Sequence, residues 1–177
     1  MIYFTADQHF HHDPIIQMCN RPYKNGHHMH KDIIRKYNEL ITDSDTVYII
    51  GDISYSKDKE PIRRIVDKLN GQKYLILGNH DYLNPFDYID MGIISVHTSL
   101  EINTSFGNYI LVHDPAISQI DRNRTFLCGH IHDLFVQQKN CINVGVDAHN
   151  FYPITIAQVN TFEERNKKEH YSLDDAL

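Results

Sequence analysis

The fold is decided by the stretch VYIIGDISYSKDKEPIRRIVDKLNGQKYLILGNHD, residues 47–81. It opens with a short apolar, β-prone run at residues 47–50 and closes with a second such run at residues 74–77. Between them apolar residues recur at helical spacing, with Pro61 near the start of the predicted helix and Gly71 just after its end. A strand, a helix and a second strand in this order are typical of an α/β arrangement.

The segments on either side of this unit extend the pattern. Toward the N-terminus the sequence predicts a buried strand at residues 2–6 and an amphipathic helix at residues 28–41. Beyond about residue 93, β-prone stretches with short connections outnumber helices. These stretches lie at residues 95–102, 109–112, 125–128, 141–146 and 154–159. We therefore expect a second sheet packed on the first, with helices on the outside.

The composition fits one ordinary globular domain. The chain has 177 residues, of which 41% are hydrophobic and 23% charged, so a real core can form. No proline-rich or glycine-rich linker separates the two halves, and we expect residues 1–177 to form a single domain. The charged segment 161–177 has weak periodicity and predicts either a short helix or a peripheral tail.

Charge and cysteine usage bound the environment and the partners. The net charge of -6 offers no sequence-wide field for a long polyanion, so extended nucleic-acid binding is not expected. Cys19, Cys128 and Cys141 never form a CxxC arrangement, which argues against a disulfide framework or a cysteine zinc site. Residues 1–10 lack the pattern of a secretory signal, and no apolar run approaches the length of a membrane span. A cytoplasmic protein with no membrane contact is the expectation.

Side chains suited to metal binding and acid–base chemistry follow the ends of the predicted strands. They are Asp7 with His9, Asp52, Asn79 with His80, His113, and His130 with His132. Open α/β sheets bind ligands outside the carboxyl ends of their strands, so five distant segments can meet there. Residues two apart in an extended segment point the same way, which predicts that Asp7 and His9 act as a pair, and His130 and His132 as another.

The kinds of side chain in this set indicate the metal. Carboxylates, imidazoles and one amide oxygen, without any thiolate, suit Mn²⁺, Fe or Zn²⁺ better than a soft metal. Without His80, the set holds seven possible metal ligands. Seven ligands exceed what a single ion needs, whereas two ions that share a bridging carboxylate use them all. The expected cofactor is a pair of divalent ions, with Mn²⁺ favoured and Fe, Zn²⁺ or Ni²⁺ as alternatives.

Taken in order, the motifs resemble those of the calcineurin-like metallophosphoesterase superfamily. They are Asp7-Gln8-His9, Gly51-Asp52, Gly78-Asn79-His80-Asp81, His113 and Gly129-His130-Ile131-His132. The resemblance spans residues 7–132 and implies a four-layer αββα sandwich, an α/β (α+β) fold of two facing mixed sheets flanked by helices. It also implies one metal held by Asp7, His9, Asp52 and His132, and another held by Asp52, Asn79, His113 and His130. Asp52 would be the bridge.

The same resemblance implies a reaction. A hydroxide that bridges the two metals would attack a phosphate ester, with His80 as proton donor beside the catalytic ligands Asp52 and Asn79. The expected substrate is small and phosphorylated, more often a phosphodiester of nucleotide type. A phosphomonoesterase is the alternative activity, and a non-catalytic metal-binding scaffold of the same fold is the alternative outside catalysis. The sequence leaves the oligomeric state open, a homo-oligomer included.

One position departs from the commoner family pattern. Many members carry an aspartate three residues after the bridging one, where this chain has Tyr55, and that carboxylate usually supports the histidine acid. Asp81 or a backbone carbonyl could support His80 instead, and the sequence does not decide between them. Asp114 has two readings as well: it could orient His113, or it could begin the turn at Pro115.

Substrate contacts are the least defined part of the prediction. His11 and His12 lie just past His9 and are expected to line the mouth of the site. Arg21 belongs to a polar, basic and aromatic run that could meet phosphate, although an ordinary exposed loop explains it equally well. Asn79 and His80 complete the expected substrate-binding set.

Overall fold

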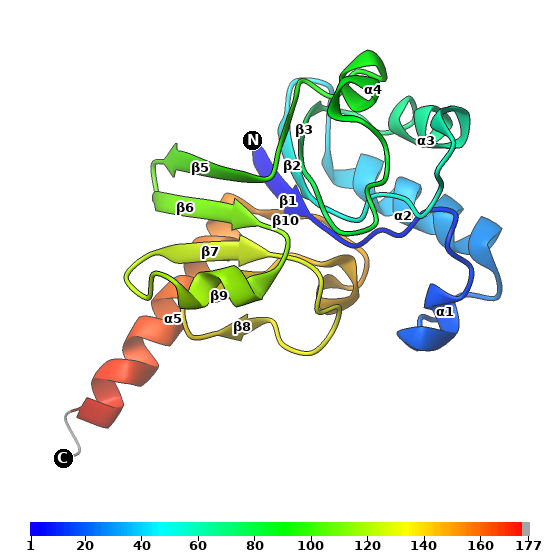
Figure 1. Ribbon diagram of the computed structural model, residues 1–177. Helices are drawn as coiled ribbons and strands as arrows, with labels where there is room; N and C mark the ends of the chain where they lie inside the picture. The colour runs from blue at the N-terminus through cyan, green and yellow to red at the C-terminus, as the bar shows by residue number, and fades with distance from the viewer. Residues whose placement is uncertain (175–177) are drawn as a thin grey trace.

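The computed structural model describes residues 1–174, which form two five-stranded sheets (Figure 1). The first sheet has the strand order β10-β1-β2-β3-β4. Its strands are β1 (Ile2–Thr5), β2 (Thr46–Ile50), β3 (Gln72–Ile76), β4 (Ser95–His97) and β10 (Ile154–Thr155). The strands β1 to β4 are parallel, and β10 is antiparallel to β1. The first sheet is therefore mixed.

The second sheet is also mixed and has the order β5-β6-β7-β9-β8. Its strands are β5 (Ser99–Thr104), β6 (Gly107–Val112), β7 (Thr125–Cys128), β8 (Gln137–Gln138) and β9 (Cys141–Asn143). The strands β6, β7 and β9 run parallel to one another, while β5 and β8 are antiparallel to their neighbours. Each sheet thus carries parallel central strands whose carboxyl ends lie on one edge.

Helices flank the sheets. They are α1 (Ile15–Met18), α2 (Gly26–Leu40), α3 (Lys59–Val66), α4 (Pro85–Asp90) and α5 (Ile156–Asp174), with 3₁₀ helices η1 (Pro115–Gln119) and η2 (Val146–His149). In Figure 1 α2, α3 and α4 lie on the side of the first sheet away from the second, while α5 begins beside the second sheet and extends away from the body. No helix within residues 1–174 is both long and apolar enough to cross a membrane.

Two layers of apolar residues hold this arrangement. Phe4 and Ile50 of the first sheet meet Leu111, Leu127 and Ile142 of the second, and these side chains are fully buried. A second cluster fills the space between the first sheet and its helices. It includes Val47, Ile49, Met29, Ile33, Tyr37, Ile62 and Val66. The alternate residues of β2 therefore point to opposite faces, and both faces are covered.

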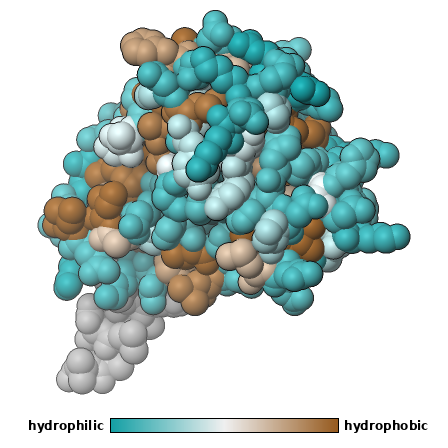
Figure 2. All heavy atoms as spheres, turned by 45° about the vertical axis from the view of Figure 1, so that its right-hand side comes forward, coloured by the Kyte–Doolittle hydropathy of each residue, from teal (hydrophilic) through white to brown (hydrophobic). Residues whose placement is uncertain are grey.

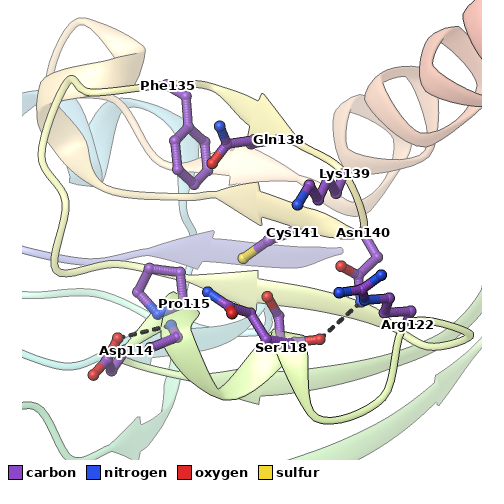
Figure 3. A pocket seen from close by; sticks show the side chains of 11 residues that line it. Asp114, Pro115, Ser118, Arg122, Phe135, Gln138, Lys139, Asn140 and Cys141 are labelled. Atoms are coloured by element: carbon purple, nitrogen blue, oxygen red, sulfur yellow. Dashed lines mark hydrogen bonds between the residues drawn. The ribbon is translucent and has the colours of Figure 1, made fainter.

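The outer face of the second sheet is more lightly covered. A small cluster of Val112, Phe126, Cys128 and Cys141 lies there. A cavity of about 260 Å³ opens between η1 and this face, and Figure 3 shows Ser118, Arg122 and Cys141 among the side chains around it. In Figure 3 Asp114 sits at the start of η1, where its carboxylate accepts a hydrogen bond from the Ala116 backbone N–H. Asp114 therefore begins the turn and does not orient His113.

The predicted fold is confirmed, since two mixed sheets are flanked by helices. The prediction of a strand over residues 154–159 is wrong beyond Thr155, where α5 begins. Thr155 and Gln158 form a reciprocal cap: the Thr155 N–H donates to the Gln158 amide oxygen, and the Gln158 N–H donates to the Thr155 hydroxyl. This Thr-x-x-Gln signal outweighs the β-prone residues that follow. The segment 161–174 is helical, and residues 175–177 lie outside the described residues.

Candidate metal centre

The strand ends of both sheets supply the predicted site residues. Asp7 and His9 follow β1, Asp52 follows β2, Asn79 and His80 follow β3, His113 follows β6, and His130 and His132 follow β7. The loops are tied together past the strands, because the Asp7 N–H donates to the Gly51 carbonyl and the His9 N–H donates to the Asp52 carbonyl. Across the two sheets, the His130 N–H donates to the Asp7 carboxylate at 2.9 and 3.0 Å. The site therefore lies where the two sheets meet.

All seven predicted ligands lie in one connected cluster. Ligand atoms of Asp7, Asp52 and His113 are within 4.8 Å of one another, and all three residues are buried. The Asp52 Oδ2 atom is 3.5 Å from His9 Nε2 and 3.5 Å from His113 Nε2. Asp52 is thus the central member, as its expected bridging position requires.

The remaining ligands lie on two sides of this centre. The Asn79 Oδ1 atom is 3.1 Å from His113 Nε2 and 2.9 Å from His130 Nδ1. On the other side, the ring centroids of His9 and His132 are 5.2 Å apart. Asn79 and His130 are exposed, so the cluster is open to solvent at this end. A substrate can approach from there.

The backbone that presents these residues is unusual. Asp7, His9, Asp52, His130 and His132 all have positive φ, between 51° and 73°. L-residues adopt this left-handed region rarely and at a cost, and such conformations gather at functional sites. The ligands in each pair are therefore presented by tight turns, and the expectation that they lie in extended segments is wrong. The two members of each pair nevertheless lie in the same cluster.

Two glycines make room for the cluster. Gly51 has φ +83°, and a Cβ atom there would lie 2.3 Å from His113 Nδ1 and 2.7 Å from the Gly78 Cα atom. At Gly129 a Cβ atom would lie 2.7 Å from the Asp7 carboxylate. All three distances are shorter than the contacts that real Cβ atoms make, so only glycine allows the loops to approach this closely.

The pKa values of the two buried carboxylates are shifted in opposite directions. Burial raises the pKa of Asp7 to about 6, although the nearby His113 and His132 oppose this shift. Burial also acts to raise the pKa of Asp52, but the hydrogen bond and charge of His113 and the His80 N–H overcome it and lower the pKa to about 2. Asp52 is therefore ionised at neutral pH.

The pKa values of two buried imidazoles, His9 and His113, are also shifted in opposite directions. Burial lowers the pKa of His9 to about 3, and the charge of Asp52 offsets only part of that effect. Burial acts to lower the pKa of His113 as well, yet its contacts with Asp52 and Asp7 raise it to about 9. The His113 Nδ1 atom is 2.9 Å from the Ile50 carbonyl oxygen, which fixes the ring orientation. His113 Nε2 faces the carboxylates.

These features fit divalent metal ions. The His9 Nε2 atom is buried with no hydrogen-bond partner, although it faces Asp52. A neutral imidazole with a free lone pair, beside two carboxylates and an amide oxygen, is the donor set of a hard or borderline cation. Buried polar atoms without partners are costly, and metal coordination would satisfy this one.

Arg21 is placed differently from the expectation that it contacts substrate. Its side chain is fully buried, and the guanidinium donates two hydrogen bonds of 2.7 Å to the Asp147 carboxylate. It also donates to the backbone carbonyls of Asp7 and Gln8. Asp147 in turn lies 2.7 Å from His132 Nδ1. Arg21 and Asp147 therefore hold two predicted ligands in place from behind, where substrate does not reach.

His80 is supported by neither of the candidates that the sequence offered. The Asp81 carboxylate accepts hydrogen bonds from the backbone N–H groups of Asp52, Ile53 and Gly78, and so joins two ligand loops. The His80 Nδ1 atom is 2.7 Å from the Tyr82 hydroxyl instead. The His80 Nε2 atom is 4.0 Å from Asp52 Oδ2, so this nitrogen faces the cluster.

His11 and His12 point in different directions. His12 stacks on the Tyr55 ring at a centroid distance of 4.0 Å, and its Nδ1 atom is 3.4 Å from His9 Nδ1. His12 therefore lies beside the predicted ligand His9. The His11 Nδ1 atom is 3.0 Å from the Ser54 hydroxyl, and its backbone N–H donates to His30 on α2. His11 thus belongs to the helical side of the first sheet.

Three residues of the site were not found from the sequence. Asp147 and Tyr82 support ligands or the predicted acid, and the Cys19 sulfur lies within 4.8 Å of ligand atoms of His132 and Asp147. The Asn79-His80-Asp81-Tyr82 order placed Tyr82 two residues from His80, and this spacing was the available signal. No local pattern marks Asp147, because its partners Arg21 and His132 are distant in sequence.

The fold and the site together define a metal-dependent class of phosphoesterases. The model of the calcineurin-like phosphoesterase family matches residues 1–174, and the chain belongs to this family. It is 30% identical over 175 residues to an uncharacterized protein of Methanocaldococcus jannaschii, with 94% of this chain and 93% of that protein covered. A protein of Mycobacterium phage L5, the gene 66 protein, is 31% identical over 87 residues, which are 48% of this chain and 42% of the phage protein.

Solved structures show the same fold. A protein of unknown function from Aquifex aeolicus superposes with a TM-score of 0.74 at 23% identity, covering 92% of this chain and 98% of that one. A structure described as a novel archaeal phosphodiesterase gives a TM-score of 0.50 at 15% identity, covering 81% of each chain. At these identities the likeness concerns the fold alone.

Proposed function

We propose that this protein hydrolyses phosphodiesters of nucleotide type at a centre of two divalent metal ions, Mn²⁺ being the favoured ion. The observation that carries the proposal is the convergence of the seven predicted ligands, with Asp52 at their centre. These carboxylate, amide and imidazole side chains come from the strand ends of both sheets. Family membership supports hydrolysis of a phosphoester. Asp52 would bridge the ions, with Asp7, His9 and His132 on one side and Asn79, His113 and His130 on the other.

Bound ions of this kind generate hydroxide from water near neutral pH and neutralise charge on the phosphoryl oxygens. The protein contributes the positions of the ligands and a proton donor. His80 presents Nε2 toward the cluster while Nδ1 contacts the Tyr82 hydroxyl, so a proton on Nε2 would face the leaving oxygen of a substrate bound there. The backbone N–H of His80 donates to Asp52, which fixes the loop that carries the acid.

The rim of the site suits an aromatic substrate group. Tyr55 is 39% exposed and Tyr82 is 41% exposed, and their rings lie 5.7 Å apart beside His80. Exposed tyrosines next to a phosphate-binding centre offer a stacking surface for a nucleobase, and stacking of this kind tolerates different bases. This rim favours a nucleotide diester over inorganic or sugar phosphates.

The proposal is tested with purified protein, freed of metal and then supplied with Mn²⁺. We expect release of p-nitrophenol from bis-p-nitrophenyl phosphate at a higher kcat/KM than from p-nitrophenyl phosphate, and loss of both activities with a chelator. The variant His80→Ala should lose at least about a hundredfold in kcat, the usual contribution of a positioned acid, while it retains bound manganese. A preference for the monoester would show that the protein is a phosphatase and not a diesterase. If neither ester is hydrolysed, the protein is a non-catalytic metal-binding scaffold.

A further inference from the structure

A groove outside the metal centre lies between α2 and α3. Its volume is about 420 Å³, and His11 forms the wall nearest the ligand loops. His27, His30 and Lys31 line it from α2, while Arg64 and Lys68 line it from α3 and the turn that follows. Figure 2 shows this side of the molecule, where the surface is largely hydrophilic and apolar residues form separate patches.

The groove carries positive charge that the described part of the chain leaves largely unmatched. The side chains of Lys31 and Lys68 make no ion pair there, and Arg64 has a single exposed contact of 3.4 Å with Glu60. Other cations of α2 and α3 are paired, such as Arg35 with Asp32 and Arg63 with Asp90. This contrast occurs in a chain whose net charge is -6.

Ring contacts and a hydrogen bond fix the inner wall of the groove. His30 is half-buried, its ring lies 5.1 Å from the His11 ring and 5.3 Å from the Phe10 ring, and its Nε2 atom accepts the His11 N–H. Burial, and then the neighbouring His11, lower the pKa of His30 to about 4, with Asp13 opposing the shift. The half-buried Ile34 and the buried Ile65 add an apolar wall.

The groove is connected to the ligand cluster through the consecutive residues His11 and His12. His12 contacts His9 and Tyr55 on one side of the segment, whereas His11 contacts Ser54 and His30 on the other. Ser54 itself lies two residues after the central Asp52 and donates to the Phe10 carbonyl. The groove therefore borders, through His11, the loop that also carries the predicted ligands Asp7 and His9.

From this juxtaposition we propose that the groove between α2 and α3 is an anion site that binds a second, non-reacting phosphate of the substrate. The inference rests on the proposed function and narrows the substrate class to compounds with at least two phosphoryl groups, such as a nucleoside bisphosphate ester or the end of an oligonucleotide. Lysine and arginine side chains supply charge-assisted hydrogen bonds to phosphate oxygens, and the local field attracts dianions.

The first test uses inorganic pyrophosphate and metal-free protein, so it does not depend on catalysis. We expect binding that shifts the side-chain NMR signals of His27 and His30, and a Kd that is approximately tenfold weaker in Lys31→Ala/Lys68→Ala, which removes two phosphate-binding cations. The matched control is Lys59→Ala/Arg63→Ala, which removes two cations of α3 that pair with Asp87 and Asp90. Absence of shifts at His27 and His30, or equal weakening in the control, would overturn the proposal.

The second test compares two chromogenic diesters with the manganese-loaded protein. One is bis-p-nitrophenyl phosphate, and the other is the 5′-(p-nitrophenyl phosphate) ester of thymidine 3′-phosphate, which adds a second phosphate. The ratio of their KM values should change about tenfold in Lys31→Ala/Lys68→Ala and stay constant in Lys59→Ala/Arg63→Ala. A constant KM ratio in both variants contradicts the groove proposal. Failure of the parent protein to hydrolyse either diester contradicts the proposed function instead. In that case the pyrophosphate experiment alone decides whether the groove binds an anion.

Discussion

At the scale of single residues, the hydroxyl of Tyr82 takes the place of a missing carboxylate. The family resemblance leads one to expect an aspartate at position 55, where this chain has Tyr55, and the Tyr82 hydroxyl contacts His80 Nδ1. The hydroxyl is neutral, so it orients the His80 ring without adding a charge beside it. The surroundings of His80 therefore differ from those that the resemblance implies.

Tyr82→Phe should lower kcat by roughly threefold to tenfold, the effect of one hydrogen bond to a neutral partner, with KM for the diester little changed because the ring remains. Steady-state kinetics with bis-p-nitrophenyl phosphate measure both constants. Tyr152→Phe is the matched control, since the Tyr152 hydroxyl contacts Glu39 on α2. An unchanged kcat in Tyr82→Phe would show that His80 needs no such support.

Asp147 is the second residue with a testable positioning role. Asp147→Asn should weaken manganese binding about tenfold to a hundredfold, because the carboxylate behind a metal-binding histidine fixes its ring and increases its basicity. Metal content after equilibrium dialysis measures this change without reference to activity. Asp133→Asn, at an exposed position next to His132, should bind manganese like the parent protein. Equal loss in the two variants would contradict the role of Asp147.

At the scale of elements, loops joined by backbone and carboxylate hydrogen bonds build the centre. Asp81 accepts three backbone N–H groups from the loops after β2 and β3. Asp81→Asn should lower the free energy of unfolding by about 1 to 3 kcal/mol, because an amide nitrogen would face N–H donors that then lack an acceptor. That corresponds to a decrease in Tm of roughly 2 to 12 °C, measurable by thermal denaturation. Asp43→Asn, at an exposed turn, should leave Tm unchanged.

Most elements that position the site could be predicted from the sequence. Apolar runs gave β1, β2, β3, β6 and β7, and helical spacing gave α2 and α3, because burial imposes these periods directly. The short elements α1, α4 and β8 were missed, because elements of two to six residues are too short to show a clear hydrophobic period. The beginning of α5 was misassigned because β-branched residues follow its Thr155 cap.

The convergence of the predicted ligands could be predicted from the sequence, but their backbone geometry could not. The ligands follow strands, and parallel strands end at one edge, so their meeting could be expected. The left-handed backbone of Asp7, His9 and Asp52 could not, since polar residues in tight turns look like ordinary loops. The burial of Arg21 was also hidden, because its partner Asp147 is 126 residues away.

At the scale of the whole molecule, metal binding and protonation compete for the same atoms. The pKa of His113 is raised to about 9, so its proton stabilises the metal-free protein below pH 6.5, and this stabilisation is lost as the pH rises through 9. A bound ion needs the neutral ring, so manganese affinity should increase from pH 7 to 9 with release of a proton. Calorimetry in buffers of different ionisation enthalpy measures that proton. His113→Gln should abolish this pH dependence, and its persistence there would assign the proton to another group.

Manganese should also increase thermal stability. At a free concentration about a hundred times Kd, one bound ion adds about 2.7 kcal/mol, or roughly 5 to 10 °C in Tm for a chain of this size. Differential scanning calorimetry with added manganese, and again with a chelator, measures the difference. Equal Tm values under both conditions would mean that the cluster does not bind the ion in the folded state.

The origin of the ligands in both sheets has a mechanical consequence. Asp7 and Asp52 extend from one sheet, and His130 and His132 extend from the other, while fully buried Phe4 and Leu127 form part of the layer between them. Ions held by all four side chains would act as a cross-link, so neither layer could open without releasing them. Amide protons in β1 and β7 should then exchange with solvent deuterium at correlated, slower rates when the ions are bound.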